Sequence, residues 1–327
     1  MSDFLSLAGQ NLLSPIILSF VLGLLAALAR SDLNIPEAVA KGMSIYLLFA
    51  IGFKGGASVA SYGLDARLGF SLLAGIILSA LLPIIAFGLL KVMTGMSRLD
   101  AAAVAAHYGS ISIVTFVAAT SVLEGRGIPS EGYMVAVAAA MEAPAILSAL
   151  WLVSRGGGAE SKGMDSALLR EIMLNGSIVL LVGAFAIGWV TGEQGLKEIE
   201  SFIVNPLKGV LCLFLLDMGL VAGRGLRGGG GVLTRGVFAF GVLMPLVGSM
   251  FGLGAGLLLG LSAGGVALMM VLSASASYIA VPAAIRVALP EANPSLYLTL
   301  SLGVTFPFNL TIGIPLYVGV AMAVSGG

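Results

Sequence analysis

Charged residues are scarce in this chain of 327 residues, where they make up 10%, against roughly a quarter in an ordinary soluble domain. The 16 basic and 16 acidic residues cancel, so there is no basic surface to hold nucleic acid. One cysteine, Cys212, excludes an internal disulfide. One histidine, His107, leaves an enzyme without the usual supply of bases and metal ligands. These shortages exclude a soluble enzyme, a DNA-binding protein and a disordered chain.

Apolar residues are plentiful instead, at 58% of the chain. A helix needs about 20 apolar residues to cross the hydrocarbon layer of a membrane. Ten runs of this kind occur, near residues 12–29, 38–60, 68–92, 100–123, 131–154, 171–191, 204–223, 232–258, 262–289 and 295–324. The sequence therefore predicts an all-α polytopic membrane protein with ten transmembrane helices.

The loop charges predict how these spans are oriented. Ten spans place both termini on one side, and eleven of the 16 basic residues then fall on the opposite side. The remaining five are Lys54, Arg67, Arg126, Lys197 and Lys208. Because the side richer in Lys and Arg is cytoplasmic, we expect a multi-pass plasma membrane protein, in the bacterial inner membrane, with both termini extracytoplasmic.

Motifs that interrupt or end the apolar runs recur in the two halves of the chain at a constant offset of 165 residues. The segment 107–115 (HYGSISIVT) aligns with 272–280 (LSASASYIA), and Pro129-Ser130 aligns with Pro294-Ser295. The predicted organisation is a first repeat at 1–154, a cytoplasmic linker at 155–170 and a second repeat at 171–327. Because each half holds an odd number of spans, five, the second half is inverted relative to the first. Inverted repeats are typical of secondary transporters.

The fourth and ninth spans are interrupted at equivalent places, by residues 109–115 and 273–282. Serine hydroxyls compete for backbone hydrogen bonds and Pro282 lacks an amide donor, so both helices are expected to break. The alternative without a binding site is two kinked helices whose serine hydroxyls bond to the preceding helical turn. Unwound backbone is tolerated in a membrane only where it lines a polar cavity, so matching interruptions indicate a transport site.

The chemistry of crossed, broken helices suits a pair of small ions. New helix N-termini, after about Ser112 and Ile279, present free amides to an anion, while carbonyls and hydroxyls suit a hard cation such as Na⁺. Glu142 is an ionisable residue within the fifth span and therefore a candidate site, and Asn309 holds a comparable place in the last span. The predicted anion ligands are Ser110, Ser112, Ser275, Ser277 and Tyr278, and the predicted Na⁺ ligands are Thr115, Glu142, Ser273 and Asn309. Lys54 is expected to extend toward the outer interface.

At these residues the chain resembles the sodium-dependent bicarbonate transporter family. The resemblance covers almost the whole chain, and its strongest motifs are GFKGG (52–56), GSISIVT (109–115), MEAPA (141–145), SASASYIAVP (273–282) and LPEANPS (289–295). It implies a fold like that of bile-acid sodium symporters. Spans 1, 2, 6 and 7 would form a gate panel, and spans 3–5 and 8–10 a core with the crossed helices.

The resemblance also implies a homotrimer and a PII-like cytoplasmic regulator. Two positions depart from the family pattern: Tyr278 stands near an acidic residue of the family, and Glu142 stands for an aspartate. The predicted function is Na⁺-coupled uptake of bicarbonate by alternating access. Alternatives are symport of another small anion or carboxylate, a channel, or a regulatory membrane protein that transports nothing. An enzyme is not expected.

Overall fold

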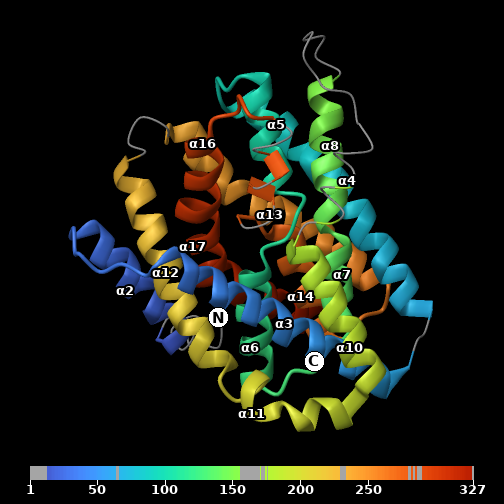
Figure 1. Cartoon of the computed structure of the whole chain (residues 1–327). Coiled ribbons are helices and arrows are strands. Elements are labelled where there is room, and N and C mark those ends of the chain that lie inside the picture. Colours follow the sequence, from blue (N-terminus) through green and yellow to red (C-terminus); the bar gives the residue numbers. More distant parts are fainter. Residues whose placement is uncertain are drawn as a thin grey trace.

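The structure is a computed structural model that describes residues 13–63, 66–154, 170, 174, 176–228, 233–278, 281–282, 284–285 and 289–325. Within these residues the regular elements are helices, with no strand. They are α2 (Pro15–Leu28), α3 (Glu37–Tyr62), α4 (Ala66–Met93), α5 (Arg98–His107), α6 (Ile113–Gly125), α7 (Met134–Ala140), α8 (Glu142–Ser154), α10 (Gly176–Glu198), α11 (Glu200–Ile203), α12 (Leu207–Gly228), α13 (Arg235–Leu258), α14 (Ala263–Ala274), α16 (Pro294–Leu300), α17 (Phe306–Phe308) and α18 (Ile314–Val324) (Figure 1). The predicted linker, apart from Arg170, lies outside the described residues.

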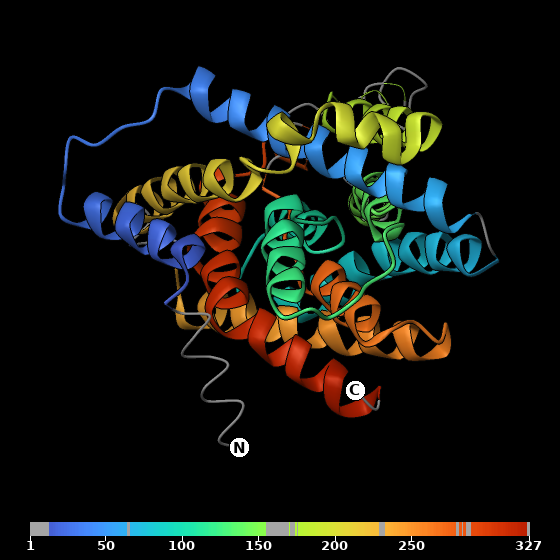
Figure 2. The same cartoon turned by 90° about the horizontal axis from the view of Figure 1, so that it is seen from below.

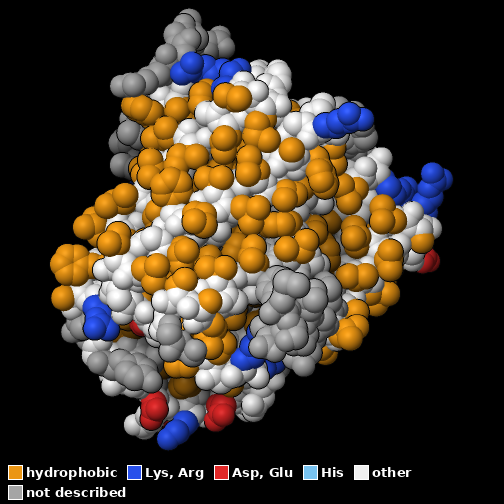
Figure 3. Space-filling view, turned by 180° about the vertical axis from the view of Figure 1, so that it is seen from behind, with side chains coloured by type: hydrophobic (Ala, Val, Ile, Leu, Met, Phe, Trp, Pro, Cys, Tyr) orange, Lys and Arg blue, Asp and Glu red, His pale blue; other side chains and the backbone are white. Residues whose placement is uncertain are grey.

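Seven helical stretches in the described part of the chain are long and apolar enough to cross a membrane, and three of them join consecutive elements: Met134–Val153, Glu200–Gly228 and Pro294–Val324. The helices α2, α6 and α14 are shorter apolar helices. The all-helical membrane architecture expected from the sequence is therefore confirmed. Figure 3 shows hydrophobic side chains spread over one face of the molecule, with charged side chains toward its margins. Such an apolar surface is stable against lipid and would aggregate in water.

Two helix pairs, α2 with α12 and α3 with α10, pack at backbone contact (Figure 2). A Cβ at Gly23 would overlap the carbonyl oxygen of Leu216, and a Cβ at Gly188 would overlap that of Phe53. Small residues permit this approach, as they do between helices in lipid. Gly23 and Gly188 are 165 residues apart, so the two pairs use matching positions of the two halves.

The helices α4 and α13 support the interruptions in the same manner. A Cβ at Gly109 would overlap Pro83 of α4, and a Cβ at Gly248 of α13 would overlap the Ser273 carbonyl and touch Ala274. Pro83 and Gly248 stand 165 residues apart, and so do Gly109 and Ala274. The offset found in the sequence thus recurs as a repeated contact in space.

Serine caps define where the interrupted spans begin. Ser97 caps α5 and Ser262, 165 residues later, caps α14. The Asn293 amide donates to the Asp100 carboxylate, 2.9 Å, which ties the start of α16 to α5. The Ser262 amide donates to the Glu131 carboxylate, 2.7 Å, just before α7.

The last predicted span is continuous but contains two π-helical turns, Ser301–Thr305 and Asn309–Gly313. Pro307 and Pro315 each stand two residues after such a turn. A proline ring clashes with the carbonyl four residues earlier, and a wider turn relieves the clash. The pattern of apolar residues predicted this helix but not its two wide turns.

Candidate functional site

The first interruption is the buried segment between α5 and α6, residues 108–112. Ser112 caps α6: its hydroxyl oxygen accepts the Thr115 amide at 3.2 Å and the Thr115 hydroxyl at 2.9 Å. The helix therefore restarts at Ile113, and the break is shorter than predicted because Thr115 belongs to the first turn of α6. That first turn carries free amides and the positive end of the helix dipole.

The second interruption begins later than predicted, because α14 continues through Ala274. Ser275 is extended, with φ −78° and ψ 159°, and its hydroxyl donates to the Val271 carbonyl at 2.6 Å. The Ser277 hydroxyl accepts the Val281 amide at 3.5 Å, where the chain is helical again. The two residues before Val281 lie outside the described part.

The two interruptions meet. The Ser277 amide donates to the carbonyl oxygen of His107 at 2.7 Å, so the second segment satisfies a carbonyl left free at the end of α5. The His107 ring is fully buried, is hydrogen-bonded through Nδ1 to the Ala103 carbonyl at 2.6 Å, and stacks on Tyr297.

Glu142 contacts the first interruption directly. The Ser110 hydroxyl donates to Glu142 Oε2 at 2.6 Å, and both side chains are buried. Among the described residues the other carboxylate oxygen accepts no hydrogen bond. Glu142 is the first residue of α8, and Ser79 donates to the carbonyl of Met141 at 2.5 Å, which holds the kink between α7 and α8. Pro144 falls in the first turn of α8, where a missing amide costs nothing.

Asn309 contacts the second interruption in the corresponding way. Its Nδ2 donates to the Ala274 carbonyl at 2.8 Å, at the end of α14, and its Oδ1 accepts the Tyr317 hydroxyl at 3.0 Å. Asn309 is 1% exposed and begins the second π-turn. A kinked span therefore supports each break: the Glu142 kink supports the first and the Asn309 turn supports the second.

We predict that Asn309→Ala destabilises the folded protein by about 1–3 kcal/mol, because it leaves the buried Ala274 carbonyl and Tyr317 hydroxyl unpaired. Thr311→Ala is the matched control, since it removes only a bond within the same helix, to the Pro307 carbonyl. Thermal unfolding in detergent measures both. Equal midpoints for the two variants would contradict the support that Asn309 gives to the break.

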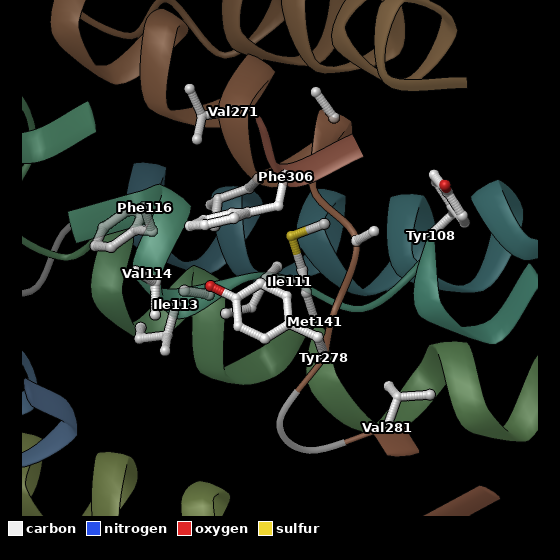
Figure 4. Close-up of a cluster of buried hydrophobic side chains, with 14 of the residues drawn as sticks. Tyr108, Ile111, Ile113, Val114, Phe116, Met141, Val271, Tyr278, Val281 and Phe306 are labelled. Atoms are coloured by element: carbon white, nitrogen blue, oxygen red, sulfur yellow. The ribbon is translucent and has the colours of Figure 1, made fainter. Parts of the chain in front are cut away.

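Tyr278 is buried and packs edge-on against Phe306, at 5.1 Å between ring centroids. Figure 4 shows its hydroxyl on the side of Ile113 and Val114, the first residues of α6. The hydroxyl lies near Ser112, and within the part of the chain that the structure describes it has no partner at hydrogen-bond geometry. A buried hydroxyl without a partner is costly unless a ligand or water completes it.

The hydrogen bonds divide the predicted ligands into donors and acceptors. Ser110 and Ser275 use their hydroxyl hydrogens on Glu142 and the Val271 carbonyl, so what they can still offer is oxygen lone pairs. Ser112 and Ser277 accept hydrogen bonds, so their own hydrogens remain to be donated. Thr115 resembles the first group, because it donates to Ser112. The Ser273 hydroxyl is buried and has no hydrogen-bond partner among the residues that the structure describes.

The sequence reasoning missed the contact that anchors the first break. Tyr108 OH lies 2.6 Å from Thr305 Oγ1, and Thr305 Oγ1 donates to the Gly241 carbonyl at 2.7 Å. Since the threonine hydrogen is used on Gly241, Tyr108 is the donor to Thr305. The only sequence signal was a phenol next to Gly109 in a segment expected to be unwound.

Lys54 also has a partner that the sequence did not indicate. Its ammonium lies 2.9 Å from Glu124 Oε1, which joins α3 to the last turn of α6. Gly52 and Gly56 allow α3 to pack closely against α10, and Gly55 allows it to pack closely against Val135 of α7. The glycines of the GFKGG motif thus set the position of the lysine.

Together the fold and site define a class: an all-helical membrane protein in which two interrupted helices meet at buried, hydroxyl-rich breaks. The chain matches the Na⁺-dependent bicarbonate transporter superfamily over residues 15–322 and belongs to that superfamily. A comparison with curated proteins gives no match. The family expected from the sequence motifs is confirmed.

Proposed function

We propose that this protein takes up bicarbonate together with Na⁺ by alternating access. The observation that carries the proposal is the hydrogen bond from the Ser277 amide to the His107 carbonyl, at the meeting point of two broken helices. Broken helices that meet within a bundle offer amides to an anion and carbonyls to a cation. Membership of the superfamily supports Na⁺ as the coupling ion and bicarbonate as the anion.

The free hydrogen-bonding groups suggest which residues take which ion. The donors left over, Ser112, Ser277 and Tyr278, are assigned to the anion, with the first amides of α6. The acceptors left over are assigned to Na⁺: Ser110, Thr115, Glu142, Ser273, Ser275 and Asn309. In this assignment Ser110 and Ser275, which the sequence placed with the anion, are cation ligands. Neighbouring ions of opposite sign lower each other's cost of burial in a medium of low dielectric.

The proposed architecture is ten spans in two inverted repeats, 1–154 and 171–327, with α2, α3, α10 and α12 as the gate panel. The contacts repeated at 165 residues, Gly23 with Gly188 and Pro83 with Gly248, support it. The inner-membrane location, extracytoplasmic termini, homotrimer and PII-like regulator remain predictions, from loop charges and from the family resemblance.

A second candidate substrate is another small carboxylate. Tyr278 motivates it, because its buried hydroxyl is a neutral donor without a hydrogen-bond partner among the described residues. A donor at this place accepts any compact anion that presents an oxygen to it. Competition of formate or acetate with bicarbonate uptake distinguishes the two substrates.

The test of the proposed function is uptake of labelled bicarbonate into proteoliposomes with and without an inward Na⁺ gradient. Ser110→Ala and Ser275→Ala are expected to lower Na⁺-driven uptake roughly tenfold, which corresponds to about 1.4 kcal/mol for one lost ligand. Ser19→Ala, a partly buried serine bonded to its own helix and away from the site, is the control. Uptake by the parent that does not depend on Na⁺ would contradict symport, and two variants that behave like the control would contradict the assignment.

A further inference from the structure

A second polar site lies away from the crossing, in a cavity of about 270 Å³. Helices α3 and α6 and the loop residues 128–132 form most of its walls, and Val135 of α7, Leu207 of α12 and Leu268 of α14 also contribute. Phe116, one turn beyond Ser112, lines its inner side. We call this cavity the vestibule, because α6 runs from the crossing at Ser112 to the rim of the cavity at Glu124.

Three ionisable side chains line the vestibule: Lys54, Glu124 and Glu131. Glu131 is engaged, because its carboxylate accepts the Ser262 amide at 2.7 Å and the Ser262 hydroxyl at 3.0 Å at the start of α14. Lys54 and Glu124 form an ion pair with 2.9 Å between Nζ and Oε1, and their side chains are 28% and 45% exposed. An ion pair this exposed adds little to stability and opens readily.

The position of Glu124 in its helix also favours a cation that can be exchanged. It lies in the last turn of α6, where the negative end of the helix dipole disfavours a carboxylate. A cation beside it relieves that repulsion. Lys54 supplies the cation in this structure, and a small metal cation would serve equally well.

We propose that the vestibule is an entry site that takes up a monovalent cation and a small oxyanion together by exchange of ion partners. Lys54 passes from Glu124 to the incoming anion, and Glu124 passes to the incoming Na⁺. The exchange conserves charge, whereas either ion alone would leave one half-buried charge unpaired. The hydroxyls of Ser58, Thr120, Ser121 and Ser130 line the same space and replace part of the hydration shell. The choice of ions rests on the proposed function.

Occupancy of the vestibule is measured with a thiol reporter. Thr120→Cys, made in a Cys212→Ser background, places one thiol in the wall, one turn before Glu124. Its rate of reaction with a membrane-impermeant thiosulfonate is compared in sodium bicarbonate, choline bicarbonate and sodium gluconate. We expect sodium bicarbonate to slow labelling at least fivefold and the other two salts to leave it unchanged.

Single variants of the pair sharpen the test. In Glu124→Gln, choline bicarbonate alone should protect the thiol, because Lys54 no longer needs release from a carboxylate. In Lys54→Met, sodium gluconate alone should protect it, because Glu124 is then free to bind Na⁺. Lys208→Met, an exposed lysine outside the cavity, is the control and should behave like the parent.

Equal protection by all three salts, or by none, overturns the proposal. Ser130→Cys is a second reporter in the same wall, and failure of both thiols to react would also overturn it, since the cavity would then be closed to water. Protection without bicarbonate uptake would contradict the proposed function and leave the entry site standing. Uptake without protection would contradict the entry site alone.

Discussion

Replacing Glu142 by glutamine is expected to raise the Na⁺ concentration that half-saturates uptake by about tenfold. The substitution keeps the size of the side chain and an oxygen that accepts the Ser110 hydroxyl, 2.6 Å away in the parent. It removes the negative charge. Interactions with a charged group contribute about 1.5–3 kcal/mol where a neutral one contributes about 1. The expected loss is therefore about 1.4 kcal/mol, which is a factor of ten in affinity.

The measurement is bicarbonate uptake as a function of external Na⁺, with the amount of folded protein checked by gel filtration. Glu37→Gln is the matched control, because Glu37 is exposed in the first turn of α3 and is expected to change nothing. The Na⁺ dependence should therefore separate the two glutamates. A Glu142→Gln protein with the parent's Na⁺ dependence would remove Glu142 from the cation site.

Adding one methyl group at Gly248 is expected to destabilise the protein, although alanine favours helix by up to about 1 kcal/mol over glycine. A Cβ at Gly248 would overlap the backbone carbonyl of Ser273, at the end of α14 directly before the second break. Overpacking costs typically about 1–3 kcal/mol and more where the neighbour cannot move. We expect a fall in the thermal midpoint of roughly 5 °C or more, with a loss of uptake because the break is displaced.

Gly254 on the same helix gives the control. It has open space around it, so Gly254→Ala should keep or raise the midpoint through helix propensity alone. The two substitutions are chemically identical, but they should shift the thermal midpoint in opposite directions. Melting of Gly248→Ala at or above the parent midpoint would mean that α13 and the break are less tightly joined than the structure indicates.

The sequence by itself determined the helical segments and the places where they fail. Runs of about 20 apolar residues can only be membrane helices, and clustered serines with Gly109 or Pro282 weaken a helix wherever it packs. Local composition is sufficient for such statements. It was not sufficient for the limits of the breaks, because Ser112 caps α6 early and α14 continues to Ala274.

Only the tertiary structure decided which groups are paired. Ser110 and Ser112 are both buried serines of one motif, yet the first gives its hydrogen to Glu142 and the second keeps its own. The partners of Lys54 and Tyr108 lie 70 and 197 residues away. Hydrogen bonds and ion pairs depend on distances of about 3 Å, and packing of distant helices sets those distances. A local sequence pattern that repeats every few residues does not specify these distances.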